Sequence, residues 1–409
     1  MPSFRWWFTS QVLSSSGLFT QNVAAAWLIL KQTGSGLDLA FLTCAAFIPV
    51  FAIGSWGGQL VDRFDHRRVL LSTQAALLLL ASTLAALPFA GQADLTSILL
   101  ISAITGAVNA VDNPARQVYA MDLVGRDLLV SAVSLFEVVL NASRVLGPAI
   151  GGIILTTAGP APCFAVNALS FLAPIVVLLR YRPQPDTAAD RSRPRSRPRA
   201  RGAVREGLRY VRSVPEIRAC VAIAAASGLI FNGTVFYPLL ATKAFHLNGG
   251  GYGALVAAFG LGALPGALLA ARTKGQPSGR AVVVLAAVTT GSMAMTAFAP
   301  DLAVGIVGLL LSGFTSIWYI AVANTLVQLR AGAHLRGRVM GVWVMALPGL
   351  SPLTSVLAAL LASAAGIRIA YLTAGLVILA AALSGTRALW PISTGVAVDR
   401  GGMTQPVRS

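Results

Sequence analysis

The sequence predicts an all-α membrane protein in which twelve transmembrane helices form two six-helix, pseudo-symmetric halves. Three observations support this class: the number and length of the apolar stretches, the placement of arginine and lysine between them, and a change of composition in the middle of the 409-residue chain. The overall composition agrees, because 56% of the residues are hydrophobic and only 11% are charged, whereas a soluble domain has about 25% charged residues.

Each apolar stretch is long enough to cross a membrane. A helix rises about 1.5 Å per residue and the hydrocarbon core of a bilayer is about 30 Å thick, so about 20 apolar residues suffice. In chain order the stretches cover residues 8–30, 38–61, 69–90, 95–118, 128–155, 161–180, 218–240, 250–271, 281–299, 302–327, 339–363 and 368–390.

The first stretch is similar to a secretory signal, because Arg5 precedes it and Ala24–Ala26 is similar to a cleavage site. It is too long for a signal core, and it carries Ser14–Ser16, Gln21 and Asn22. These polar residues suit a helix that lines a polar pathway better than they suit the apolar core of a signal. We therefore predict an uncleaved first helix.

The cations define an orientation. If the N-terminus is cytoplasmic, nearly all of the 31 Lys and Arg fall in segments on the cytoplasmic side. The exceptions are Lys31, Lys243 and Arg368, which fall outside, and Arg144, which lies within a stretch. Because cytoplasmic loops carry the excess of positive charge, we expect both termini in the cytoplasm and a multi-pass protein of the cytoplasmic (inner) membrane.

A net charge of +17 raises nucleic acid as a partner. We do not expect one, because the cations are spread over every cytoplasmic loop, where they set topology and face anionic lipid headgroups. The densest run, residues 191–201, is typical of a solvated linker.

The three cysteines, Cys44, Cys163 and Cys220, lie far apart in or beside apolar stretches, and the three histidines are scattered. This spacing predicts no disulfide framework and no zinc site. We expect no metal and no cofactor.

The chain divides in its middle. Residues 1–180 form the first predicted half, 181–217 a basic cytoplasmic linker rich in Arg, Pro and Ser, 218–390 the second half and 391–409 a cytoplasmic tail. The linker is too polar and too interrupted by proline to pack as a core.

Weak features of the first half recur in the second. Asn22 in the first stretch corresponds to Asn232 in the seventh, and Asn109 in the fourth corresponds to Asn324 in the tenth. A Gly-x-Leu triplet at residues 58–60 likewise corresponds to residues 266–268. A duplicated six-plus-six design of this kind is typical of alternating-access transporters.

The loop after the second stretch carries the strongest motif, Gly-Gln-Leu-Val-Asp-Arg-Phe-Asp-His-Arg-Arg at residues 58–68. It resembles the signature between helices 2 and 3 of the major facilitator superfamily, except that Asp65 occupies the position of the usual second glycine. Gly58 would allow a close helix approach, and Asp62 would cap or pair with the start of the eleventh helix, near Arg338. We predict a conformational latch; the alternative is a basic loop that only sets topology. The predicted latch residues are Gly58, Asp62, Arg63, Arg67 and Arg116.

Three further segments, residues 112–117, 141–152 and 336–339, resemble the exporter branch of this superfamily, which includes enterobactin exporters and bacterial antibiotic-efflux proteins. Gly147-Pro148 with Gly151-Gly152 also resembles the antiporter signature of helix 5, although Ser143 stands where that signature has glycine. The resemblance covers all twelve stretches and implies the major facilitator fold and export.

The fifth stretch carries two full charges well inside it, Glu137 and Arg144. Glu137, Asn141, Arg144 and Pro148 are spaced by four, three and four residues, so they share one helix face. Charges inside a membrane are costly, so this face should look into the bundle. Arg144 is a candidate for anion recognition or for a structural anchor. Glu137, Arg144 and Asp112 are the candidates for proton coupling, with a position at the cytoplasmic rim as the alternative for Glu137.

The resemblance implies a substrate cavity lined by helices 1, 4, 7 and 10. Aromatic rings with a few amides suit a large, mostly apolar ligand, and they suit helix packing nearly as well. The candidates on these stretches and in the fifth are Gln21, Asn22, Asn109, Asn141, Asn232, Tyr237, Trp318, Tyr319 and Asn324.

Together these features predict a monomeric secondary exporter of a small organic molecule, such as a siderophore or an antibiotic, by proton antiport. Import of a small metabolite has the same topology and remains an alternative, as does a membrane receptor or assembly scaffold without transport. An enzyme is not expected, because no catalytic motif is present, and the sequence has no Walker loop for an ATP-driven pump.

Overall fold

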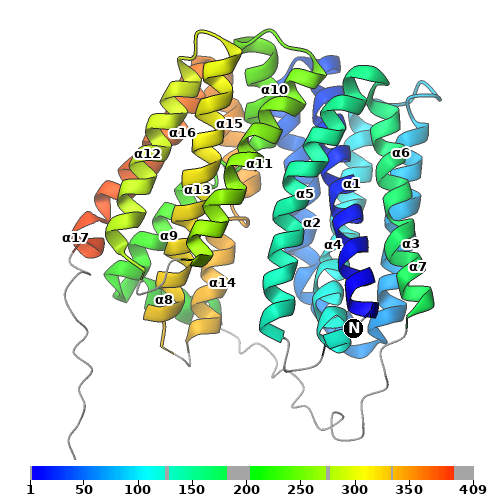
Figure 1. Ribbon diagram of the computed structural model, residues 1–409, viewed down its shortest axis with the longest axis horizontal. Coiled ribbons are helices and arrows are strands. Elements are labelled where there is room, and N and C mark those ends of the chain that lie inside the picture. The colour runs from blue at the N-terminus through cyan, green and yellow to red at the C-terminus, as the bar shows by residue number, and fades with distance from the viewer. Residues whose placement is uncertain (1, 125–128, 182–202, 273–276, 333–334, 391–409) are drawn as a thin grey trace, which may run out of the picture.

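We analysed a computed structural model that describes residues 2–124, 129–181, 203–272, 277–332 and 335–390. The described chain consists of helices joined by short connections (Figure 1). The linker run 191–201 and the tail 391–409 lie outside the described residues.

The first half contains seven helical segments. α6 and α7 are separated only by Phe171 and together span Pro160–Arg180, the sixth predicted stretch. The segments are α1 (Pro2–Thr33), α2 (Gly36–Arg63), α3 (His66–Ala86), α4 (Leu95–Val124), α5 (Leu129–Thr157), α6 (Pro160–Ser170) and α7 (Leu172–Arg180).

The second half begins with an additional helix and contains two interrupted spans. α9 and α10, with one π-helical turn (Leu240–Ala244), cover the seventh stretch, and α14 and α15 cover the eleventh. The segments are α8 (Ala203–Ser213), α9 (Pro215–Ser227), α10 (Gly233–Leu239), α11 (Gly249–Arg272), α12 (Gly279–Ala297), α13 (Leu302–Arg330), α14 (Arg336–Ala346), α15 (Ser351–Ala365), α16 (Ile367–Ser384) and α17 (Thr386–Leu389).

Helices lie over all twelve predicted stretches. Within the described residues, nine helical spans are long and apolar enough to cross a membrane. The stretches outside this set are α1, which carries serines and amides along its length, α5, whose described apolar part is Ala142–Thr157, and the interrupted α9–α10. A total of twelve crossings therefore stays a prediction.

The two halves repeat one helix contact. In the first half, a Cβ atom on Gly57 of α2 would collide with the carbonyl oxygen of Ala110 on α4. In the second half, Gly266 of α11 meets the carbonyl of Phe314 on α13 in the same way. Glycine is needed at such crossings because it lets two backbones touch. The repeated contact is the geometry that a duplicated architecture predicts.

The halves meet mainly at one end of the bundle. α5 packs against α11, α2 packs against α15, and α1 and α2 contact α10. At the closest crossing, a Cβ atom on Gly152 would lie 2.7 Å from the Cα of Gly253, and Cys44 approaches the carbonyl of Pro352. The end that carries the N-terminus and α8 is where the two halves diverge (Figure 1).

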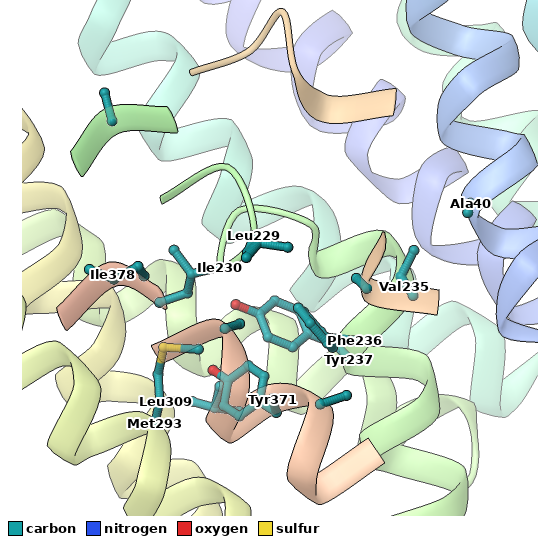
Figure 2. Close-up of a cluster of buried hydrophobic side chains, with 14 of the residues drawn as sticks. Ala40, Leu229, Ile230, Val235, Phe236, Tyr237, Met293, Leu309, Tyr371 and Ile378 are labelled. Atoms are coloured by element: carbon teal, nitrogen blue, oxygen red, sulfur yellow. The ribbon is translucent and has the colours of Figure 1, made fainter. Parts of the chain in front are cut away.

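The core follows this arrangement. A large apolar cluster joins α1 and α2 to most helices of the second half, and a smaller one around Trp7, Leu70 and Tyr119 fills the N-terminal end of the first half. In the large cluster, Phe236 of α10 meets Tyr371 of α16 edge to face, with ring centroids 5.4 Å apart. Figure 2 shows these rings beside Met293 and Leu309.

The segment predicted to be linker contains one packed helix, α8. Gly207 on α8 approaches the backbone carbonyl of Arg338 on α14, and the Tyr210 hydroxyl donates to the carbonyl of Arg330 at 3.4 Å. Val211 is buried, whereas Arg205 and Arg209 face outward. The sequence did not predict this helix, because its composition is polar and only one narrow side of it is covered.

Candidate functional site

A cavity of about 460 Å³ lies between the two halves. It is bounded by α1, α2 and α5 of the first half and by the α9–α10 connection, α10, α11, α13 and the α14–α15 connection of the second. Its lining residues are Phe19, Asn22, Val23, Thr43, Phe47, Arg144, Pro148, Ile230, Phe231, Asn232, Gly233, Thr234, Tyr237, Tyr252, Val256, Phe259, Gly260, Ala263, Ile317, Ile320, Leu347, Pro348 and Ser351.

Aromatic rings form much of the wall. Phe259 of α11 lies at the centre of this group: its ring centroid is 6.2 Å from that of Phe231 and 5.8 Å from that of Tyr237. Tyr252 stacks on Trp27 of α1 with centroids 6.2 Å apart, so it also joins the two halves. Apolar, aromatic walls with a few polar groups are typical of sites for small organic molecules.

The breaks in the two interrupted spans, between α9 and α10 and between α14 and α15, both line the cavity. Asn232 links the two spans. Its amide nitrogen donates to the carbonyl of Gly228 at 3.0 Å and to the Thr354 hydroxyl at 2.7 Å. Its amide oxygen accepts from the Ser355 hydroxyl at 2.6 Å. Asn232 is only 4% exposed, so it lines the cavity with its side chain already satisfied by the protein.

Arg144 is the one charged side chain among the described residues that line the cavity. It is exposed, lies one turn before Pro148 on α5, and its carbonyl faces Gly260 of α11. Asn22 of α1 is the other exposed polar group of the lining, and Thr43, Thr234 and Ser351 supply hydroxyls.

The cavity contains some of the residues predicted from the sequence and not others. Asn22, Asn232 and Tyr237 line it, together with Arg144 and Pro148. The side chains of Glu137 and Asn141 lie outside the described part of the structure.

Five predicted cavity residues do not line it. Gln21 accepts a hydrogen bond from Asn167 at 2.7 Å, and the Tyr319 hydroxyl lies 2.6 Å from that of Ser227. Trp318 packs against Phe314, Asn324 accepts from Gln328, and Asn109 is half-buried on α4 away from the lining. These positions were chosen by span alone, and neighbouring residues on a helix point about 100° apart.

Most of the aromatic wall was not predicted from the sequence, because it comes partly from α2 and α11. Phe47, Tyr252 and Phe259 belong to stretches 2 and 8, which were not considered as lining. One signal was available for the two breaks: Asn232-Gly233 and Pro348-Gly349 interrupt otherwise apolar stretches, a pattern that marks binding sites in transporters.

The glycines of the helix 5 motif lie in close helix contacts. Gly147 packs on α1, where its carbonyl accepts from the Thr20 hydroxyl at 2.9 Å. Gly151 also faces Thr20, and Gly152 forms the crossing with Gly253 of the other half. The motif therefore joins α5 to both α1 and α11.

A second polar site lies inside the first half, away from the cavity. Asp112 of α4 is fully buried, and it forms an ion pair with Arg116 one turn later. Thr73 and Gln74 of α3 donate to the same carboxylate at 2.6 and 2.7 Å. Arg116 also donates to Gln11 of α1 at 2.7 Å. This cluster, Asp112 with Arg116, Gln11, Thr73 and Gln74, connects three helices.

Three arginines at or near the predicted latch have partners elsewhere in the described part of the structure. Arg116 is turned into the buried cluster, and Arg338 at the start of α14 pairs with Glu206 of α8. Arg67 donates to the carbonyl of Leu178 at 2.6 Å, so it links α3 to the end of α7.

The other residues of the loop after α2 are described only in part. Arg63 is exposed, and the side chain of Asp62 lies outside the described part. Asp65 caps α3 by accepting from the backbone N–H of Arg68 at 2.9 Å.

The close approach expected at Gly58 is wrong by one residue. A Cβ atom on Gly58 would meet open space, whereas one on Gly57 would strike the carbonyl of Ala110. A helix turns by about 100° per residue, so only Gly57 faces α4.

This difference gives a test of the α2–α4 contact. Gly57→Ala should destabilise the protein by about 1–3 kcal/mol, because a backbone carbonyl cannot move away as a side chain can. Gly58→Ala is the matched control and should leave stability unchanged. Thermal unfolding of the detergent-solubilised variants measures both, and equal midpoints for the two variants would contradict the contact.

Membrane-spanning helices in two similar halves around a central cavity define a membrane transporter. The chain matches the model of the transmembrane secretion effector family over residues 1–400. It therefore belongs to this family of the major facilitator superfamily, and the resemblance seen in the loop after α2 is confirmed. The predicted all-α major facilitator fold is confirmed as well.

Relatives in this family include named pumps and exporters. The chain is 31% identical to the multidrug efflux pump Tap of Mycolicibacterium fortuitum, over 87% of this chain and 88% of that protein. It is 27% identical to the enterobactin exporter EntS of Citrobacter koseri, over 84% of this chain and 81% of that protein.

Solved structures share the fold. A D-xylose-proton symporter superposes with a TM-score of 0.71 at 17% sequence identity, covering 93% of this chain and 97% of that chain. A bacterial homolog of the human lysosomal transporter Spinster, in an inward-facing and occupied conformation, gives a TM-score of 0.72 at 12% identity, covering 96% and 98%.

Proposed function

We propose that this protein is a secondary active exporter that moves a small organic molecule out of the cell by alternating access, driven by inward proton flow. The observation that carries the proposal is the cavity between two halves that meet mainly at one end. The names of the relatives support export of an antibiotic-like or siderophore-like compound.

In the proposed orientation both termini lie in the cytoplasm. We propose that the protein is a monomer in the inner membrane of the cell. The distribution of arginine and lysine supports the orientation. In this orientation the contacts of Gly152 with Gly253 and of α2 with α15 lie at the outer side, and the halves diverge toward the cytoplasm. That is the state in which an exporter takes up its substrate.

The buried cluster around Asp112 is the proposed proton site, with Glu137 as the other candidate. An ionised Asp112 accepts from Thr73, Gln74 and Arg116 at once. A proton on this carboxyl would replace the ion pair with a weaker contact and free Arg116. Arg116 lies toward the cytoplasmic end of α4, so it would then be available to the latch with Asp62 and the start of α14.

The coupling is tested by measuring efflux of a fluorescent dye from cells that express the protein. A protonophore should stop efflux, whereas ATP depletion with the proton gradient maintained should not. Efflux that survives the protonophore and stops on ATP depletion would contradict proton coupling.

The latch gives a prediction of its own. Asp62→Asn should keep expression and folding but lower turnover about tenfold, because it removes a charge at the end of α2 and no packing atom. Arg180→Gln, which removes an exposed charge from the end of α7 and lies outside the predicted latch, is the comparison. Unchanged transport in Asp62→Asn would return the loop to a purely topogenic role.

A further inference from the structure

The charge of the cavity wall indicates which charge a substrate carries, whereas the size and shape of the cavity do not. Among the described lining residues, Arg144 carries the one full charge, and that charge is positive. The described lining contains no carboxylate. The remaining polar groups, on Asn22, Thr43, Thr234, Asn232 and Ser351, are neutral.

The surroundings of Arg144 strengthen its effect on a ligand. The wall around it is mainly aromatic and aliphatic, with Phe19, Phe47, Phe231 and Phe259 among the lining residues. A charge beside such a wall is screened less than one at an open surface, so attraction to an anion and repulsion of a cation both increase.

The guanidinium is suited to one kind of partner. Its planar fork of N–H groups matches the two oxygens of a carboxylate, a sulfonate or a phosphate. Because the group has five N–H donors, a contact with another part of the protein leaves donors for a ligand.

We infer that the substrates of this protein are aromatic or otherwise apolar molecules that carry an acidic, ionised group, which Arg144 binds while the rings of the wall hold the apolar body. This inference rests on the proposed export function and specifies the substrate class of the same cavity. A cationic amphiphile is the class that the cavity disfavours.

The sign of the substrate charge has a consequence for energetics. Exchange of one proton inward for one monoanion outward moves two elementary charges across the membrane, whereas exchange of a proton for a monocation moves none. A membrane potential that is negative inside therefore favours export of an anion in addition to the pH gradient. Export should depend on membrane potential at a fixed pH gradient.

Two xanthene dyes of similar size and opposite charge, fluorescein and rhodamine 123, test the inference. Binding is measured by fluorescence anisotropy with the full-length protein in lipid nanodiscs. Fluorescein should bind at least tenfold more tightly than rhodamine 123. Arg144→Gln should remove this preference, and Arg144→Lys should keep part of it, because lysine retains the charge and loses the fork.

Two control variants distinguish the loss of the charge of Arg144 from general damage to the protein. Asn22→Ala alters the same cavity without a change of charge and should affect both dyes alike. Arg209→Gln removes an exposed charge from α8 and should affect neither. Rhodamine 123 binding more tightly than fluorescein, a preference unchanged by Arg144→Gln, or no measurable fluorescein binding would each overturn the inference.

Transport assays distinguish this inference from the function on which it rests. In proteoliposomes, export of fluorescein should fall severalfold when valinomycin and equal potassium abolish the membrane potential. If rhodamine 123 is moved and fluorescein is not, the exporter stands and the substrate class is wrong. If fluorescein binds through Arg144 but is not moved, the site stands and the proposed function fails.

Discussion

Asp112→Ala should leave little folded protein in the membrane. Asp112 is fully buried, and its carboxylate is the common acceptor for Thr73, Gln74 and Arg116. Removing one member of a buried ion pair leaves the other charge without compensation, at a cost of about 3–5 kcal/mol. The monodisperse peak in size-exclusion chromatography of the solubilised protein should shrink, and the midpoint of thermal unfolding should fall.

A double-mutant cycle identifies the cause. Arg116→Ala alone should also destabilise, and Asp112→Ala combined with Arg116→Ala should cost less than the sum of the single changes. Asp112→Asn keeps an acceptor for Thr73 and should be the mildest change, which makes it the variant for coupling assays. An Asp112→Ala protein as stable as the wild type would show that the cluster contributes nothing to the fold.

Gly152→Leu should lower the transport rate at least tenfold while the protein still folds. A Cβ atom at this position would already lie 2.7 Å from the Cα of Gly253 on the other half. Because the Cβ is fixed to the backbone of α5 and the Cα belongs to the backbone of α11, the two helices would have to separate at the end where the halves meet. In the proposed orientation, the state with a closed outer side and a cavity open to the cytoplasm would then be lost, and we expect turnover to fall at least tenfold.

Cysteine labelling measures that state directly. In a background without Cys44, Cys163 and Cys220, Asn22→Cys places a thiol in the cavity. A membrane-impermeant maleimide should label it from the cytoplasmic side, and Gly152→Leu should suppress this labelling. Gly291→Leu is the control, since a Cβ at Gly291 meets no neighbour. Equal labelling with and without Gly152→Leu would contradict the role of the crossing.

Much of the fold could be predicted from the sequence, because hydropathy and arginine placement are properties of whole spans. An error of a few residues in the bounds of a stretch changes neither its hydropathy nor the arginine distribution. Contacts that depend on one residue were less predictable: Gly57, not Gly58, faces α4, and α8 packs although its composition is polar. Helix rotation and the docking of a short amphipathic helix depend on tertiary packing, which sequence periodicity does not fix.

The site was predicted best where residue chemistry allowed few environments. A full charge inside a span, as at Arg144, has to face a cavity or a partner, and glycines spaced as in Gly147 and Gly151 favour close helix contact. Amides and aromatics have many acceptable environments. Gln21 and Tyr319 have partners within the protein, whereas aromatic residues of α2 and α11 form part of the wall.

The most direct test of secondary transport through this cavity is substrate exchange in proteoliposomes that contain the purified protein and no ATP. Each of the two dyes is offered outside, and the amount inside is determined after lysis at one fixed pH. With no gradient, proteoliposomes preloaded with the unlabelled dye should take up the labelled dye faster than proteoliposomes that are not preloaded. With an acidic interior, the dye that the protein carries should accumulate, although passive entry of a weak acid would favour an alkaline interior. Accumulation that appears only after ATP is added, or an absence of exchange for every compound that binds the cavity, would contradict the account.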